Sequence, residues 1–433
     1  MKKFIALFLA VLMVVAVFAG CSSNGDTTTK ANADDTATEE LLKKEPIPEA
    51  VTIDPSTVTV PDDFKVGFIF LHDETSTYDK NFIDAANAAC EALGIKKENI
   101  LMKTGIAEDT ICTETALDLI DQGCKYIFAD SFGHESFLIE AAKANPDVQF
   151  FHATGTRAHT EGLDNYHNAF ASIYEGRYLA GVAAGMKLNE LKDAGKLKGD
   201  VPKMGYVGAF TYAEVMSGYT SFYLGAKSVC PDVVMDVTFT GSWYDEAAEK
   251  TAAEKLIASG ADLISQHADS MGAPSACEAA GIPNVSYNGS TVDKCPNTFI
   301  VSSRINWAPY MIYSIANTVN GTASEKDWTG TIATDSVVLT DINEKVAAAG
   351  TAEKIAEVKA DLEAGKINVF DTKNFTVGGK TLTSAAADID SDENMAHESE
   401  AIVDGVYKES VFRSAPYFDL EIDGITLLDK NFG

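Results

Sequence analysis

Short apolar runs alternate with amphipathic stretches between residue 65 and residue 302. The runs are rich in Val, Ile, Phe and Tyr, which is typical of strands. Residues 81–94 and 247–260 instead have helical periodicity, and each stretch ends at a glycine, a common residue just after a helix. We expect strands at residues 65–70, 99–103, 126–129, 148–152, 203–210, 233–240, 263–267, 284–287 and 298–302.

This alternation predicts parallel sheets built from right-handed βαβ units. Two runs of such units predict two doubly wound α/β lobes, and the lysine-rich stretch 188–201 is expected to be a loop between them. Residues 326–433 read as a C-terminal extension that packs on the lobes, with a helix in 341–365 and a hairpin in 374–382. We assign residues 60–170, with about 300–325, to lobe 1 and residues 171–298 to lobe 2.

The N-terminus follows a different pattern. Lys2 and Lys3 precede an unbroken apolar run at residues 4–18, which is shorter than the roughly 18 residues that a membrane-spanning helix needs. Residues 1–20 are therefore expected to be a signal peptide that is removed. The string FAGC resembles a bacterial lipobox, which implies a lipid on Cys21 and a place on the outer face of the cell membrane. An ordinary secretory signal with an incidental cysteine is the alternative.

Residues 21–48 are polar and acidic with few large apolar side chains, so we expect them to form a flexible tether. The whole chain carries a net charge of −30, which disfavours nucleic acid and anionic lipid headgroups as partners. Six further cysteines lack the spacing of a zinc site or a disulfide scaffold. A bridge between Cys277 and Cys295 stays open at this point.

Candidate ligand-binding residues follow the strands, because ligands of open α/β sheets bind beyond the carboxyl ends of the strands. These segments are rich in aromatic and neutral polar side chains, which suit a planar, uncharged, hydrogen-bonding ligand such as a nucleobase. The candidates are Tyr78, Asp79, Phe82, Asp130, Ser131, Phe132, Thr154, Gly155, Phe210, Trp243, Asp269 and Asn288.

Structural roles compete with several of these assignments. Phe82 also fits the apolar stripe of its helix, and Asp269 also fits the cap of the next helix. Tyr78, Ser131, Thr154 and Asn288 belong to residue types that are common in turns and caps.

The sequence contains no motif that indicates catalysis instead of binding. The chain has no GxSxG, Walker GxxxxGK[ST] or HExxH string, and its histidines have no metal-ligand spacing. We therefore expect no enzyme activity, no metal and no cofactor. An extracellular nucleoside hydrolase would need a carboxylate or metal cluster that the sequence does not show.

Six motifs carry a family resemblance: Asp79-Lys80-Asn81-Phe82, FFHATGT at 150–156, GRYLAG at 176–181, GYVGAF at 205–210, SWYD at 242–245 and QHADS at 266–270. Together they resemble the basic membrane protein family, substrate-binding lipoproteins of ABC importers that are related to the purine nucleoside receptor. The resemblance spans residues 60–320 and, more weakly, 321–380. It implies the type I periplasmic-binding-protein fold, a purine ligand, and an ABC permease and ATPase as partners.

The resemblance also implies roles for single residues. Phe82 would lie against the base, and Asp79 would cap its helix or contact the ligand. Nucleoside-binding members carry an aromatic residue and a ribose-binding aspartate where this chain has Gly218 and Asn288, which favours a free base such as adenine. Trp243 would then sandwich the base against Phe82 or Phe132. A nucleoside, a sugar, and a sensor or adhesin role on the same fold remain alternatives.

Overall fold

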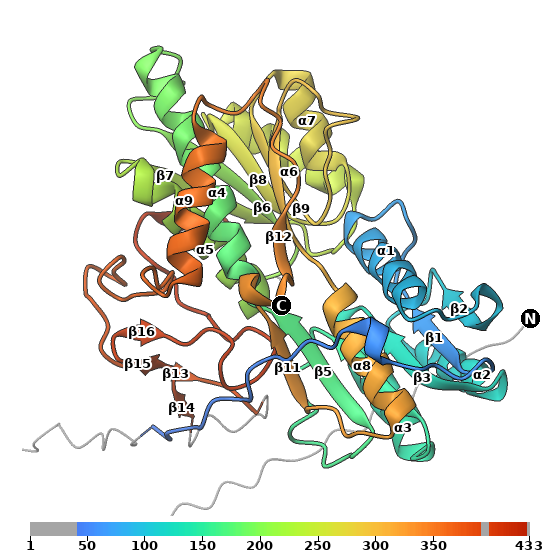
Figure 1. The fold of residues 1–433 in the computed structure, drawn as a ribbon. Coiled ribbons are helices and arrows are strands. Elements are labelled where there is room, and N and C mark those ends of the chain that lie inside the picture. The colour runs from blue at the N-terminus through green and yellow to red at the C-terminus, as the bar shows by residue number, and fades with distance from the viewer. Residues whose placement is uncertain (1–40, 391–397, 431–433) are drawn as a thin grey trace, which may run out of the picture. The chain divides into compact units, whose positions relative to one another are not determined.

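The computed structural model describes residues 41–390 and 398–430. The expected signal peptide, Cys21 and the tether as far as residue 40 lie outside these residues. Two open sheets form the framework of the described residues (Figure 1). Their strand orders are β11-β5-β4-β3-β1-β2 and β12-β10-β9-β8-β6-β7-β17. Neighbouring strands run parallel except for β12, which pairs antiparallel with β10. Each sheet is the centre of one lobe.

Lobe 1 has helices on both faces of its sheet. α1 and α8 contact each other on one face, and α2 and α3 contact each other on the other. The central strands β1 and β3 are apolar except for one lysine each, as expected for strands covered on both sides. The elements are β1 (Lys65–Ile69), α1 (Thr77–Ala92), β2 (Ile100–Lys103), α2 (Thr110–Asp121), β3 (Cys124–Ala129), α3 (Glu135–Ala144), β4 (Gln149–Ala153), β5 (Tyr166–Ala171), α8 (Ala308–Asn320) and β11 (Asp327–Gly330).

Lobe 2 repeats this arrangement. α4 and α5 contact each other on one side, α6 and α7 contact each other on the other, and α9 packs on α4. The elements are α4 (Ile173–Asp193), β6 (Lys203–Gly208), α5 (Ala213–Val229), β7 (Val234–Phe239), α6 (Glu246–Ala258), β8 (Leu263–His267), α7 (Gly272–Ala280), β9 (Asn284–Tyr287), β10 (Phe299–Ile305), β12 (Val337–Leu339), α9 (Thr351–Glu363) and β17 (Ile425–Leu427).

The chain crosses between the lobes three times. The crossings lie between β5 and α4, between β10 and α8, and between β11 and β12. Because β10 belongs to the sheet of lobe 2, the return to lobe 1 comes after Ile305 rather than near residue 300. The stretch 188–201 does not connect the lobes: it begins in the last turns of α4 and leads to β6 within lobe 2.

Glycines let α4 and α5 approach each other closely. A Cβ atom on Gly181 would lie 2.0 Å from the carbonyl oxygen of Phe222, and a Cβ on Gly225 would lie 2.0 Å from that of Tyr178. No larger residue fits at either position without moving the helix backbones. The second glycine of the GRYLAG motif is therefore a packing residue, and the close contact fixes α4, which carries Arg177, against lobe 2.

The C-terminal segment after β12 covers parts of both lobes. It contains α9 and two antiparallel strand pairs, β13 (Ala386–Ala387) with β14 (Ser399–Glu400) and β15 (Ile402–Val403) with β16 (Val406–Tyr407). Its last strand, β17, extends the second sheet beside β7. Residues 41–48, at the end of the expected tether, run beside this segment: the N–H groups of Leu42 and Ile47 donate to the carbonyls of Glu398 and Val411. β11 and β12 are sheet strands, so the extension proper starts after Leu339.

All nine strands predicted from the apolar runs are present, and no end differs by more than three residues. The six cysteines of the described residues are all buried and free, and so no Cys277–Cys295 bridge is present. Within the same residues, no helix has the length and apolar character needed to cross a membrane.

Candidate functional site

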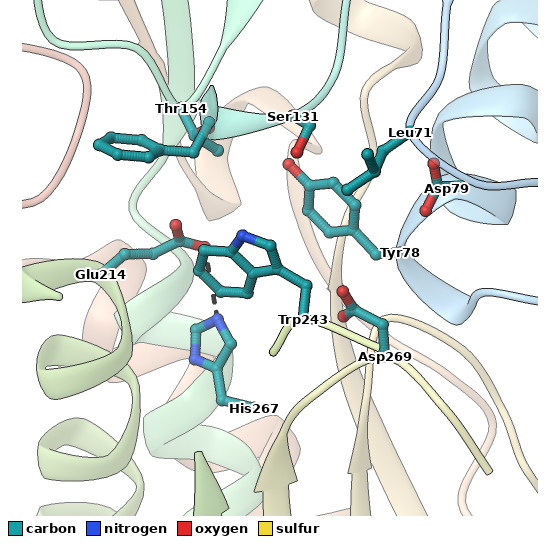
Figure 2. A pocket seen from close by; sticks show the side chains of 10 residues that line it. Leu71, Tyr78, Asp79, Ser131, Thr154, Glu214, Trp243, His267 and Asp269 are labelled. Atoms are coloured by element: carbon teal, nitrogen blue, oxygen red, sulfur yellow. Dashed lines mark hydrogen bonds and ion pairs between the residues drawn. The ribbon is translucent and has the colours of Figure 1, made fainter. Parts of the chain in front are cut away.

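A cavity lies between the two lobes where the carboxyl ends of their strands meet. Lobe 1 and lobe 2 each supply part of its lining, and we call this cavity the slot. Its residues are Leu71, Tyr78, Asp79, Ser131, Phe132 and Thr154 from lobe 1, and Glu214, Trp243, His267 and Asp269 from lobe 2. Figure 2 shows Asp79 and Asp269 at one end of the slot and Thr154 and Glu214 at the other, with Tyr78 and Trp243 between them.

The slot is narrow. Its cavity volume is only about 20 Å³. Such a gap has room for about one water molecule, so any larger ligand requires the lobes to separate for entry. Contacts across its rim hold the lobes together: both the backbone N–H and the hydroxyl of Thr77 donate to the carbonyl of Asp269, at 3.0 and 3.2 Å. The rings of Phe132 and Tyr212 also meet, 5.3 Å apart.

Aromatic rings line both sides of the slot. Tyr78 comes from the first turn of α1, and its hydroxyl donates to the backbone carbonyl of Asp130 at 2.7 Å. Trp243 follows β7, and its ring meets the edge of Phe210 with centroids 5.0 Å apart. Both rings are thus held in place by neighbours outside the slot, so that little side-chain freedom is lost when a flat ligand stacks on them.

The two carboxyl groups at one end of the slot differ in their surroundings. Asp79 accepts hydrogen bonds from the backbone N–H of His72 at 2.7 Å and the hydroxyl of Ser76 at 2.6 Å. Burial raises the pKa of Asp79, but the His72 ring, whose Nδ1 lies 3.4 Å from the carboxylate, outweighs burial together with these two hydrogen bonds and lowers the pKa overall. Burial, with Asp79 and two glutamates nearby, raises the pKa of Asp269 well above its usual range. This shift favours the protonated form of Asp269, which offers both a donor and an acceptor.

At the other end, Glu214 of α5 contacts His267, with 3.3 Å between the carboxylate and Nε2. Burial lowers the pKa of His267, which favours the neutral ring. Arg177 lies beneath these groups and is fully buried; its guanidinium is 3.5 Å from the centre of the Tyr287 ring, and Nη1 donates to the carbonyl of Gln266. This buried cation stabilises nearby negative charge in the slot.

Seven of the twelve predicted binding residues line the slot: Tyr78, Asp79, Ser131, Phe132, Thr154, Trp243 and Asp269. Phe82 does not. It is completely buried in lobe 1, where it stacks on Trp307 at 4.5 Å and meets Tyr78 edge-on at 4.8 Å. Its helical stripe faces the core, and so Phe82 supports Tyr78 from behind instead of meeting the ligand space.

Asp130 and Gly155 also lie behind the slot. The carboxylate of Asp130 accepts the backbone N–H of Leu71 at 3.1 Å and is completely buried, and burial raises its pKa well above the usual range. A Cβ atom on Gly155 would lie 2.1 Å from Nδ2 of Asn168 and 2.3 Å from Oε1 of Glu135. Gly155 is therefore required for close packing against these polar side chains.

Phe210 and Asn288 are the other two predicted residues outside the lining. Phe210 packs on Trp243 and Tyr212. Asn288 has a left-handed backbone with φ of 65° and donates its N–H to the carbonyl of Ser303. Gly218 lies beneath His267, where a Cβ atom would come within 2.9 Å of Nδ1. Neither Gly218 nor Asn288 lines the slot.

Three lining residues were not among the candidates: Leu71, Glu214 and His267. Leu71 continues an apolar strand and resembles a core residue, while Glu214 resembles an ordinary acidic residue in the first turn of a helix. His267 ends a predicted strand, and this position could have identified it as a residue near the ligand site. Over the described residues no group of three or more His, Cys, Asp or Glu side chains has the geometry of a metal site.

Two doubly wound lobes with a cavity between them make up the type I periplasmic-binding-protein fold. A solute-binding protein of an ABC transporter system from Aeropyrum pernix K1 has the same fold, with a TM-score of 0.58 and 17% identity over 74% of this chain and 94% of that one. A family model, "ABC transporter substrate-binding protein PnrA-like", matches residues 68–369. The chain belongs to this Bmp family of ABC transporter substrate-binding proteins.

Curated relatives fall in the same group. The purine-binding protein BAB2_0673 of Brucella abortus is 34% identical over 61% of this chain and 72% of its own length. A putative glucose-binding protein of an ABC transporter, TsgA13 of Haloferax volcanii, is 33% identical over 42% of this chain and 43% of its own length. The nucleoside-binding protein BmpA of Lactococcus lactis is 26% identical over 63% of this chain and 66% of its own length. These relatives are binding proteins by name and differ in the ligand they bind.

Proposed function

We propose that the slot binds a purine, with the base stacked between the aromatic side chains of the two lobes. Tyr78 and Phe132 contribute rings from lobe 1, and Trp243 contributes its indole from lobe 2. The observation that carries this proposal is a narrow gap lined by aromatic rings from both lobes and bounded at one end by Asp269. Stacking on aromatic rings stabilises a bound base by about 1–3 kcal/mol for each contact.

Asp269 favours adenine among the purines. Adenine presents the N7 acceptor beside the N6 amino donor, whereas guanine presents two acceptors, N7 and O6, at the same edge. A protonated carboxyl group has one donor and one acceptor and so complements the adenine edge. The raised pKa of the buried Asp269 supports this protonated form.

The proposed biological role is delivery of this ligand to an ABC permease and its ATPase at the extracytoplasmic face of the cell membrane. The family match and the purine-binding relative support the transport role. The signal-like residues 1–20 support export, and the FAGC string supports a lipid anchor on Cys21. Residues 21–40 would then act as the tether between the membrane and the lobes.

Isothermal titration calorimetry tests the ligand. The chain without residues 1–21 is unfolded and refolded to remove carried-over ligand, and then titrated with adenine, guanine, hypoxanthine, adenosine and glucose. We expect one-to-one binding, tightest for ligands that carry the adenine ring. Binding of glucose without any purine would contradict the proposal and would favour a sugar, as the name of the Haloferax relative suggests for that protein.

A further inference from the structure

A second cavity adjoins the slot at its Thr154 and Glu214 end, and we call it the annex. Phe132, Thr154 and Glu214 line both cavities, so the two spaces meet at these side chains. The annex is larger than the slot, with a cavity volume of about 210 Å³. The residues that line the annex but not the slot are Thr156, Tyr212, Ala213, Arg413, Ala415 and Pro416.

One wall of the annex comes from the C-terminal segment. Residues 413–416 lie beyond the part of the chain, residues 68–369, that matches the family model. The fold nevertheless brings them to the ligand site. The annex wall is thus a feature of this chain that the family match does not cover.

This wall is firmly anchored. Arg413 is buried and donates to the backbone carbonyls of Ala415, Pro416 and Ile389, at 3.2 Å each. The N–H and hydroxyl of Ser414 donate to the carboxylate of Asp327, on strand β11 of lobe 1, at 2.8 and 2.6 Å. These hydrogen bonds hold the backbone of residues 413–416 in one position, as a wall that selects ligands by shape requires.

Thr154 is the polar group at the junction of the two cavities. It is buried, its hydroxyl has no hydrogen-bond partner among the described residues, and its φ of 69° is unusual for a β-branched residue. A buried hydroxyl without a partner costs free energy unless a ligand or water supplies one. Thr154 is thus placed to bind a hydroxyl group of a ligand that reaches from the slot into the annex.

The charge at the junction restricts this part of the ligand. Glu214 contributes a carboxylate to both cavities. The guanidinium of Arg413 is directed to carbonyl groups of its own segment. A phosphate in the annex would therefore meet the Glu214 carboxylate, and the Arg413 guanidinium that lines the annex already donates to three backbone carbonyls. A neutral group with hydroxyls meets no such repulsion.

We propose that the annex receives a neutral, hydroxyl-bearing substituent of the bound purine, and that residues 413–416 of the C-terminal segment set the size of substituent that the site accepts. The order of side chains along the slot supports this, because an edge of the base held at Asp269 leaves the rest of the ligand directed toward Thr154 and Glu214 (Figure 2). The inference rests on the proposed purine function and adds a second compartment to it.

The test compares adenine, adenosine and adenosine monophosphate by calorimetry on the wild type and on Ala415→Leu, which fills the annex from the wall. Ala213→Leu fills the annex from lobe 2, at the half-buried first position of α5, and serves as a second variant if Ala415→Leu does not fold. Val403→Phe, at an exposed position of the same segment, is the control. Adenine binding by each variant reports that its slot is intact.

We expect wild type to bind adenine and adenosine but not the monophosphate. Filling the annex should weaken adenosine binding by about tenfold or more and leave adenine within about twofold, as for other size restrictions in a pocket. An unchanged ratio of adenosine to adenine affinity in both annex variants overturns the inference while leaving the purine function in place. Failure of wild type to bind any purine refutes the proposed function and this inference with it.

Discussion

Trp243 gives the sharpest test of stacking in the slot. The chain has three tryptophans. Trp307 and Trp328 are buried in lobe 1, at 1% and 2% exposure, whereas Trp243 is only partly buried and lines the slot. A purine that stacks in the slot should therefore change the fluorescence of Trp243 and leave the other two nearly unchanged.

Replacing Trp243 with Ala removes one stacking face and the edge contact with Phe210. Loss of a base-stacking ring costs about 1–3 kcal/mol, which corresponds to an affinity roughly fivefold to 150-fold weaker. Trp243→Phe keeps a smaller ring and should lose less affinity than Trp243→Ala. Both variants should lose the ligand-dependent fluorescence change, because the remaining tryptophans lie in the core of lobe 1.

Fluorescence titration with adenine, checked by calorimetry, measures both effects. Trp307→Phe is the matched control, since Trp307 contacts Phe82 in lobe 1 and does not line the slot. This control should keep the ligand-dependent change. The stacking argument is wrong if Trp243→Phe keeps the full fluorescence change, or if Trp243→Ala binds adenine as tightly as wild type at unchanged thermal stability.

Three further predictions follow from single groups. Asp269→Asn should bind adenine within about threefold of wild type, because an amide also pairs with the N6 and N7 edge. In calorimetry across pH, the adenine affinity of the wild type should fall as pH rises, while that of Asp269→Asn should not; equal pH profiles would refute a protonated Asp269. Burial raises the pKa of Glu249 from 4.5 to about 7, so the folded state holds a proton that the unfolded state releases between these values. Denaturant unfolding should therefore show stability falling by about 1.4 kcal/mol per pH unit across this window, with a flatter profile for Glu249→Gln, and identical profiles would contradict this assignment. Thr77→Val removes one of the two hydrogen bonds that Thr77 donates to lobe 2, so ligand should dissociate a few-fold faster in stopped-flow measurements than from wild type or from the exposed-site control Thr57→Val. An unchanged off-rate would show that the Thr77 hydroxyl does not hold the lobes together.

Most strands of the lobes and two of their helices were predictable because their local signals agree with the packing. Apolar runs such as YIFA are buried on both faces in β3, and the expected helix at residues 247–260 matches α6. β5 was not predicted, because its sequence YHNAFA contains His and Asn and no β-branched residue. Its His167 and Asn168 hydrogen-bond to neighbouring segments, and these partners can only be identified in the fold.

The site was predictable by position along the strands and less so by side-chain direction. Residues that follow the strands do gather at one edge of each sheet, yet neighbours such as Asp130 and Ser131 differ, because one side chain turns to the Leu71 N–H and the other lines the slot. The helical period of residues 81–94 allowed Phe82 to face either the core or the ligand, and only the tertiary packing decides between these two positions. No sequence pattern indicated that residues 413–416 line the annex, because these residues follow no predicted strand and reach the ligand site only through the tertiary fold.

The most direct test of the account is calorimetry of the refolded, ligand-free chain with adenine, in wild type and in Trp243→Ala. The account predicts one-to-one binding by the wild type and an affinity roughly fivefold to 150-fold weaker in the variant. It would be contradicted by absence of adenine binding to a correctly folded wild type, or by equal affinities for the two proteins.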